Sequence, residues 1–88
     1  MIIWTVETRE GGEVIDGNLF LGSSLELCEK FIRNNLDLIT TDKTHWAVYA
    51  LCLDYDVYND AVCPPDYLIL QNNNNDLFYY DAKGNKKE

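Results

Sequence analysis

The order of hydrophobic and polar positions predicts two extended segments at the start of the chain. Residues 2–7 are β-branched and aromatic, which is typical of a strand, and Gly11-Gly12 supplies a turn soon after them. An extended apolar pattern resumes over residues 13–21, where Asp16-Gly17-Asn18 interrupts it. The pattern allows either one bulged strand or two short ones over these residues.

The next segment, residues 24–35, has the periodicity of an amphipathic helix. Its hydrophobic positions recur at helical spacing: Leu25, Cys28, Phe31 and Ile32. Leu36 continues this apolar stripe beyond the segment. Ser23 and Glu26 fit a capping box, in which the Ser23 hydroxyl accepts a hydrogen bond from the Glu26 amide. Asn34-Asn35 then predicts a left-handed stop. We expect one helix that packs by its apolar face.

Three further strands are predicted in the second half of the chain. Residues 45–55 are apolar on both alternating faces, which indicates a central strand. Pro64-Pro65 ends the mixed segment that follows, because proline breaks regular pairing. Residues 67–71 and 76–81 then indicate a hairpin around a run of four asparagines, which tolerates left-handed backbone.

The resulting order, β-β-α-β-β-β, predicts an α+β fold. We expect a small antiparallel or mixed sheet of about four to five strands with one amphipathic helix packed on one face. Residues 1–82 are predicted to form a single compact domain, and residues 83–88 a flexible polar tail. The other face of the sheet is then exposed to solvent, covered by residues 54–66 or buried by a partner.

Charge narrows the classes of partner. Seven basic side chains against fifteen acidic ones give a net charge of −8. Residues 1–82 alone carry −10, because four basic side chains stand against fourteen acidic ones there. This charge argues against direct binding to nucleic acid and to anionic membranes, both of which require clustered Lys and Arg.

Neither a targeting signal nor a membrane span is expected. The apolar start of the chain is interrupted at Glu7, and no segment approaches the about 18–20 apolar residues that cross a bilayer. The three cysteines are odd in number and contain no C-x-x-C pair, which favours a reducing compartment. A cytoplasmic location is therefore predicted.

The motifs favour neither an enzyme nor a metalloprotein. Asp54 to Asp60 places carboxylates at alternating positions, as calcium loops do, but Tyr58, Asn59 and Pro65 stand where that loop requires a polar ligand, a glycine and a glutamate. His45 is the single histidine, and no motif surrounds any cysteine, so thiol catalysis and a zinc site are both disfavoured. We expect no catalytic residue, no metal and no cofactor.

What remains is a stretch of acids interleaved with aromatics. Aromatic side chains are rigid anchors for binding, while carboxylates attract a basic partner. The residues predicted to bind a partner are Asp54, Tyr55, Asp56, Tyr58, Asp60 and Asp66. A second such cluster follows at residues 76–81.

Apart from an enzyme that uses Cys63 or His45, which no motif favours, three functional interpretations stay open at this stage. The favoured hypothesis is an inhibitor or regulator that occupies a basic surface on another protein, including one that binds nucleic acid. The plainer alternative is that the aromatics fill the core and the acids only confer solubility. The third is a homo-oligomeric structural or ligand-binding subunit, such as a homodimer, that uses an apolar sheet face.

Overall fold

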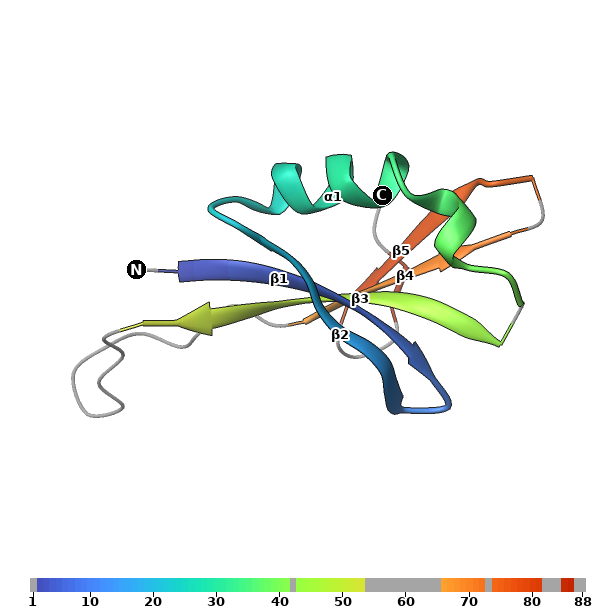
Figure 1. Ribbon diagram of the computed structural model, residues 1–88, viewed down its shortest axis with the longest axis horizontal. Coiled ribbons are helices and arrows are strands. Elements are labelled where there is room, and N and C mark those ends of the chain that lie inside the picture. Colours follow the sequence, from blue (N-terminus) through green and yellow to red (C-terminus); the bar gives the residue numbers. More distant parts are fainter. Residues whose placement is uncertain (1, 42, 54–65, 73, 82–84, 87–88) are drawn as a thin grey trace.

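The computed structural model describes residues 2–41, 43–53, 66–72, 74–81 and 85–86. In chain order its elements are β1 (Ile2–Glu10), β2 (Glu13–Gly22), α1 (Leu25–Arg33), the 3-10 helix η1 (Leu36–Leu38), β3 (Thr44–Cys52), β4 (Tyr67–Gln71) and β5 (Leu77–Asp81). The strands form one antiparallel sheet in the order β2-β1-β3-β4-β5 (Figure 1). The predicted α+β fold and its element order are confirmed.

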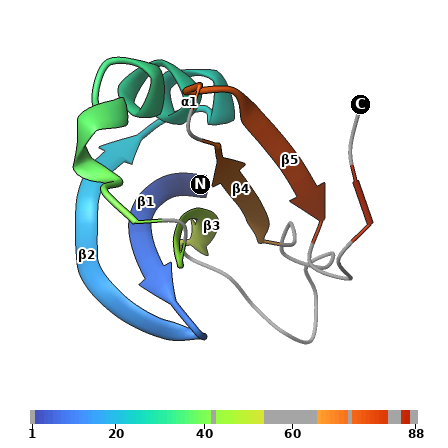
Figure 2. The same ribbon diagram turned by 90° about the vertical axis from the view of Figure 1, so that its right-hand side faces the viewer.

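The sheet is strongly curved, and α1 closes its concave side. Viewed along the length of the molecule, β2 and β1 rise on one side, β4 and β5 rise on the other, and the helix lies across the opening between them (Figure 2). Side chains alternate between the two faces of a strand. Each strand therefore contributes one set of residues to the concave, helix-covered face and another to the convex face.

The core lies between α1 and the concave face. Trp46 and Val48 of β3 are completely buried there, together with Cys28 and Ile32 of the helix. On the convex face, Ala47 is also completely buried, so the central strand is covered on both sides as its apolar pattern predicts. Burying such side chains stabilises the fold by about 25 cal/mol per Å² of apolar surface removed from water.

Partly buried polar groups connect η1 to the sheet. The Trp46 indole Nε1 donates to Gln71 Oε1 at 3.1 Å, and Gln71 Nε2 donates to the backbone carbonyl of Leu36 at 2.8 Å. The Phe31 ring lies between two other rings, stacked on Phe20 at 5.1 Å and edge-on to Trp46 at 6.5 Å between centroids. These contacts fix the C-terminal end of α1 over the strands.

Both ends of α1 differ from the sequence-based prediction. The N-cap is Ser24, whose hydroxyl accepts from the Leu27 amide at 3.3 Å, so the cap lies one residue later than the Ser23 box predicted. Asn34 at the C-terminal end has φ −84°, so the predicted left-handed stop is wrong. The chain instead continues through Asn35 into η1, where the Asn35 side chain donates to the carbonyl of Phe31 at 2.7 Å.

Residues 13–22 form one bulged strand, which settles the alternative left open by the sequence. Val6 is opposite Phe20 and Thr8 is opposite Asp16, so β2 has extra residues between these two pairs. Asn18 in this bulge has φ 51°, and its Oδ1 accepts a hydrogen bond from the Thr5 hydroxyl at 3.2 Å. The bulge increases the curvature of the sheet at its β2 edge.

Two described residues near the C-terminus lie against β5. The Asp81 amide donates to the carbonyl of Asn85 at 2.9 Å, and Lys86 Nζ lies 5.2 Å from the centroid of the Phe78 ring. Residues 82–84 and 87–88 are outside the described part of the chain. The domain boundary and the flexible tail therefore stay predictions.

Candidate functional site

Of the six residues predicted to bind a partner, the structure places one. Asp66 directly precedes β4, its side chain is 47% exposed, and its Oδ2 lies 3.8 Å from Arg9 Nη2. Asp54, Tyr55, Asp56, Tyr58 and Asp60 lie outside the described residues. The predicted acidic site is therefore located only at its C-terminal end, beside the convex face of the sheet.

Arg9 is the centre of a polar cluster on that convex face. Its Nε donates to Glu7 Oε2 at 2.7 Å, and its guanidinium lies 6.0 Å from the centroid of the Tyr49 ring. The hydrogen bond to Glu7, followed by the charges of Glu7 and Asp66, raises the pKa of Arg9 although burial acts against this. The guanidinium is thus neutralised on the convex face.

His45 is directly opposite Arg9 in the β1–β3 register and completes this cluster. Burial, followed by the positive charge of Arg9, lowers the pKa of His45. The imidazole is therefore neutral at neutral pH.

Of the three cysteines, Cys28 and Cys52 are described, and neither is placed as a nucleophile. Cys28 is a completely buried free thiol, and desolvation, followed by the charge of Glu29, raises its pKa to about 11. It belongs to the helix on the concave side, whereas His45 is on the convex face. A reactive cysteine requires a lowered thiol pKa, whereas the pKa of Cys28 is raised. Cys28 and His45 therefore do not act together as a nucleophile and its base.

Cys52 is disulfide-bonded, which the odd count of cysteines did not predict. Disulfides persist in oxidising compartments and are rare in the cytoplasm. The cysteine count therefore no longer supports a reducing compartment. A cytoplasmic location stays a prediction.

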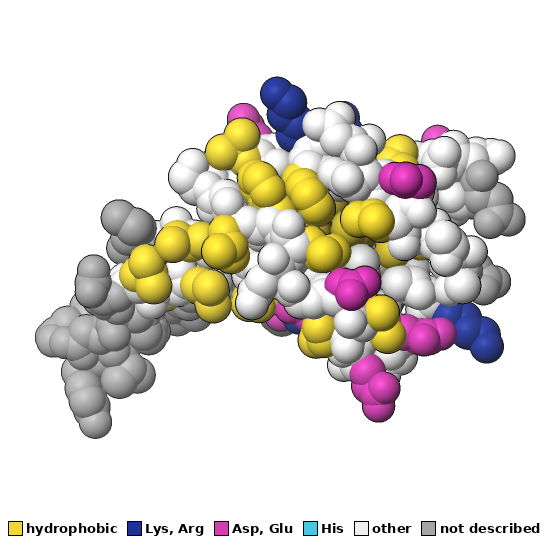
Figure 3. Space-filling model, viewed as in Figure 1, with side chains coloured by type: hydrophobic (Ala, Val, Ile, Leu, Met, Phe, Trp, Pro, Cys, Tyr) yellow, Lys and Arg dark blue, Asp and Glu magenta, His cyan; other side chains and the backbone are white. Residues whose placement is uncertain are grey.

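The far end of the β1–β2 hairpin forms an exposed surface that was not singled out from the sequence. We call it the hairpin surface and define it as Glu10, Glu13, Val14, Ile15 and Asp16. All five residues are exposed, Val14 at 54% and Ile15 at 51%. Figure 3 shows acidic side chains beside hydrophobic ones over this hairpin, at the bottom of the view.

The backbone explains why these side chains face water. Gly11 and Gly12 both have positive φ, 59° and 88°, which produces the tight turn of the hairpin. Beyond the turn, Val14 is opposite Arg9 and Asp16 is opposite Thr8, so Ile15 is an extra residue in a bulge. The sequence contained one signal for this surface, since adjacent valine and isoleucine on a strand cannot both point to one core.

The carboxylates of the hairpin surface form no ion pair within the described part of the chain. There, the ion pairs join Arg9 to Glu7 and to Asp66, and Glu10, Glu13 and Asp16 take part in none of them. Glu10 and Glu13 are directly opposite each other across the two strands. Like charges in this position destabilise a sheet.

The described residues contain neither a metal-binding group nor a membrane-spanning helix. Among them, no three His, Cys, Asp or Glu side chains come together in a group suited to a metal ion. Within the same ranges, no helix has the length and hydrophobicity needed to cross a bilayer.

Comparison of the chain with models of protein families, with curated proteins and with solved structures finds no match.

Proposed function

We propose that this protein is a small acidic binding module that inhibits or regulates another protein by occupying a basic surface on it. The observation that carries this proposal is the hairpin surface, where the exposed Glu13 and Asp16 stand before and after the exposed Val14 and Ile15 along β2. Glu10 and Glu13 face each other there, and neither forms an ion pair with a described residue. A local arrangement that costs stability is typical of a functional site.

The two kinds of side chain have different roles in the proposed contact. Val14 and Ile15 lose water when a partner covers them, which is worth about 25 cal/mol per Å² of apolar area. The carboxylates attract a basic partner over long range, raise the association rate and repel acidic proteins. A net charge of −8 strengthens this attraction.

The same charge determines which macromolecule is the partner. Nucleic acid is repelled, because its phosphates carry the same sign as this surface. A protein that binds nucleic acid has the opposite property, since its binding site presents clustered Lys and Arg. Carboxylates spaced along a hairpin would occupy such a site in place of phosphates.

The edge position of β2 favours recognition through side chains over strand pairing. β2 is the outer strand of the sheet, so one side of its backbone is unpaired within the described sheet. The bulges opposite β1 interrupt its regular register. Bulges of this kind protect an edge from pairing with another strand.

The proposal is tested by affinity capture from the source cell, followed by measurement of binding to the captured protein. The main variant is Glu13→Lys/Asp16→Lys, and its control is Glu26→Lys/Asp37→Lys, which reverses two exposed charges elsewhere on the molecule. A third bait reverses the residues predicted from sequence: Asp54, Asp56, Asp60 and Asp66. We expect a basic protein to bind the wild type, to bind the hairpin variant at least about tenfold more weakly, and to tolerate the control.

The hairpin variant separates loss of binding from loss of folding. Glu13→Lys replaces a like-charge pair with an attractive pair opposite Glu10, so the variant should be no less stable than the wild type. If the hairpin variant and its control lose equal binding affinity, the interaction depends on net charge alone. That result would contradict the proposed surface. Capture of no basic protein by the wild type would contradict the proposed function.

A second candidate function is supported by the convex face of the sheet. Leu70 is 41% exposed on this face, and the half-buried Leu68, Phe78 and Tyr80 lie beside it on β4 and β5. Leu51 is 40% exposed on the same face toward the other end of β3. A second copy of the chain would bury these side chains, as a homo-oligomeric subunit requires. Light scattering tests this alternative, because a dimer at micromolar concentration supports it and a monomer supports the acidic binding module.

A further inference from the structure

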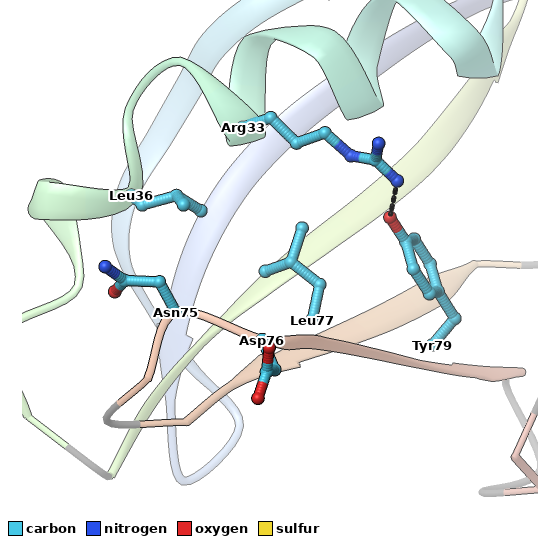
Figure 4. Close-up of a pocket in the computed structure, with 6 residues that line it drawn as sticks. All are labelled: Arg33, Leu36, Asn75, Asp76, Leu77 and Tyr79. Carbon is cyan, nitrogen blue, oxygen red and sulfur yellow. Dashed lines mark hydrogen bonds between the residues drawn. The ribbon is translucent and has the colours of Figure 1, made fainter.

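A shallow pocket of about 250 Å³ lies between the C-terminal end of α1 and the β4–β5 hairpin (Figure 4). We call it the Arg33 pocket. It is separate from the hairpin surface and shares no residue with it. The residues that line it are Arg33, Leu36, Asn75, Asp76, Leu77 and Tyr79.

The apolar part of the pocket is formed by two leucines. Leu36 begins η1 and Leu77 begins β5, and both are partly buried against the core. The pocket is small and open to solvent on one side, so it suits a small group at the end of a ligand. A short branched aliphatic group matches both this size and this lining.

On the side of α1 and β5, two hydrogen-bond donors converge. Arg33 reaches from the helix toward β5, and its Nη2 donates to the Tyr79 hydroxyl at 3.3 Å (Figure 4). Because that hydroxyl oxygen accepts from Arg33, its own hydrogen is available to donate elsewhere. The guanidinium has further N–H groups, and all of them are donors.

Each acceptor side chain at the rim takes one hydrogen bond from the β4–β5 hairpin itself. Asn75 Oδ1 accepts from Gln71 Nε2 at 3.0 Å, and Asp76 Oδ2 accepts from Asn72 Nδ2 at 3.1 Å. The Asp76 carboxylate points away from Arg33 (Figure 4). On the side of Arg33 and Tyr79, the polar groups that the pocket offers to a ligand are therefore donors beside a positive charge, and such groups recognise an anion.

We propose that the Arg33 pocket binds a carboxylate carried on a short branched aliphatic group. Arg33 and Tyr79 would hold the carboxylate, since the planar fork of a guanidinium matches two carboxylate oxygens. Leu36 and Leu77 would contact the aliphatic group. Phosphate fits less well, because the leucines offer no hydrogen bond to its remaining oxygens.

This chemistry has two sources, a free aliphatic acid and the C-terminal residue of a peptide. Isovalerate represents the free acid, and N-acetyl-leucine places the same branched group and carboxylate behind a peptide bond. Isovaleramide and N-acetyl-leucinamide are the uncharged counterparts of these two probes. Whichever acid binds more tightly identifies the source.

The experiment is a titration of the folded protein followed by the NMR shifts of its backbone amides. We expect at least one acid to bind with a Kd in the millimolar range, its amide counterpart to bind about tenfold more weakly, and inorganic phosphate to bind more weakly than the acid. The shifts should centre on residues 36 and 75–79. If neither acid binds more tightly than its amide, or if the shifts centre elsewhere, the proposal is wrong.

Variants test the assignment of the donors. Arg33→Gln should weaken binding of the acid about tenfold, and Tyr79→Phe should weaken it severalfold while keeping the ring. The control is Lys30→Gln, which removes an equal charge from the same last helical turn but does not line the pocket. Equal losses in the Arg33 and Lys30 variants, or no loss in the Arg33 variant, would overturn the proposal without affecting the role of the hairpin surface.

Discussion

Glu7 and Arg9 form an ion pair of 2.7 Å on the convex face of the sheet, from neighbouring same-face positions of β1. The Glu7 residue is only 3% exposed, so its charge is almost completely removed from water. Arg9 also approaches the Tyr49 ring and Asp66. One guanidinium therefore links β1, β3 and the residue before β4.

Loss of the buried carboxylate should destabilise the fold. Glu7→Gln removes the charged partner of Arg9. Because the Arg9 side chain is only 23% exposed, its charge is then left poorly compensated, and the expected cost is about 1–3 kcal/mol of unfolding free energy. Urea denaturation measures it. Glu10→Gln, on an exposed residue of the same strand, should change stability by less than about 0.5 kcal/mol. A neutral effect of Glu7→Gln would show that the pair contributes no net stability.

Stability should decrease on mild acidification because of His45. Its pKa is lowered in the folded protein by burial and by the charge of Arg9, so the unfolded chain binds the proton more readily. The contribution is fully present above the unfolded pKa of about 6.5 and is lost as the pH falls from there toward the folded value. Chemical denaturation at a series of pH values from neutral to mildly acidic measures this slope.

A histidine variant identifies the source of that slope. His45 is the single histidine in the chain, so His45→Gln should remove the part of the pH dependence that lies just below pH 6.5. The slope at lower pH, where carboxylates titrate, should remain. An unchanged slope in the variant would assign the effect to other groups.

Substitution of two neighbouring serines tests the position of the helix N-cap. Ser24→Ala removes the hydroxyl that accepts from the Leu27 amide and should cost about 1 kcal/mol of unfolding free energy. Ser23→Ala should cost less than about 0.5 kcal/mol, because Ser23 is exposed and precedes the cap. Thermal or urea unfolding measures both losses of stability. A larger loss for Ser23→Ala than for Ser24→Ala would show that Ser23 is the N-cap, as predicted from sequence.

The fold was predictable because its signals are local and repeated along each element. The apolar residues on both faces of residues 45–55 predicted a central strand, and β3, which ends at Cys52, has two neighbours in the sheet. The helical spacing of Cys28 and Ile32 predicted two positions that are completely buried. Each of these hydrophobic patterns extends over several residues. The element is therefore still predicted when its end is misplaced by one residue.

Features that depend on a single residue or on distant contacts were not predictable in this way. Ser23 and Ser24 have the same chemistry, and only the packing of the helix decides which of them is the cap. The Arg33–Tyr79 hydrogen bond joins residues 46 positions apart. The hairpin surface depends on the register of β2 against β1, because Ile15 is exposed as an extra residue of a bulge.

The contact between Gly22 and Phe20 shows how closely β2 is packed where the chain enters the helix. A Cβ atom at Gly22 would lie 2.6 Å from Phe20 Cε2 and 3.4 Å from Leu27 Cβ. The Phe20 ring cannot move aside easily, because it is stacked on Phe31. Gly22→Ala should therefore cost about 1–3 kcal/mol of unfolding free energy, as overpacking does.

Gly17→Ala is the matched control for that substitution. A Cβ atom at Gly17 would meet Val14 Cγ1 at 3.6 Å, which is ordinary van der Waals contact, and Gly17 is exposed. The change at Gly17 should stay within about 0.5 kcal/mol in the same urea denaturation experiment. Equal effects at the two glycines would mean that the cost arises from the strand backbone. A larger cost at Gly22 alone would locate it in the packing of Phe20 against the helix.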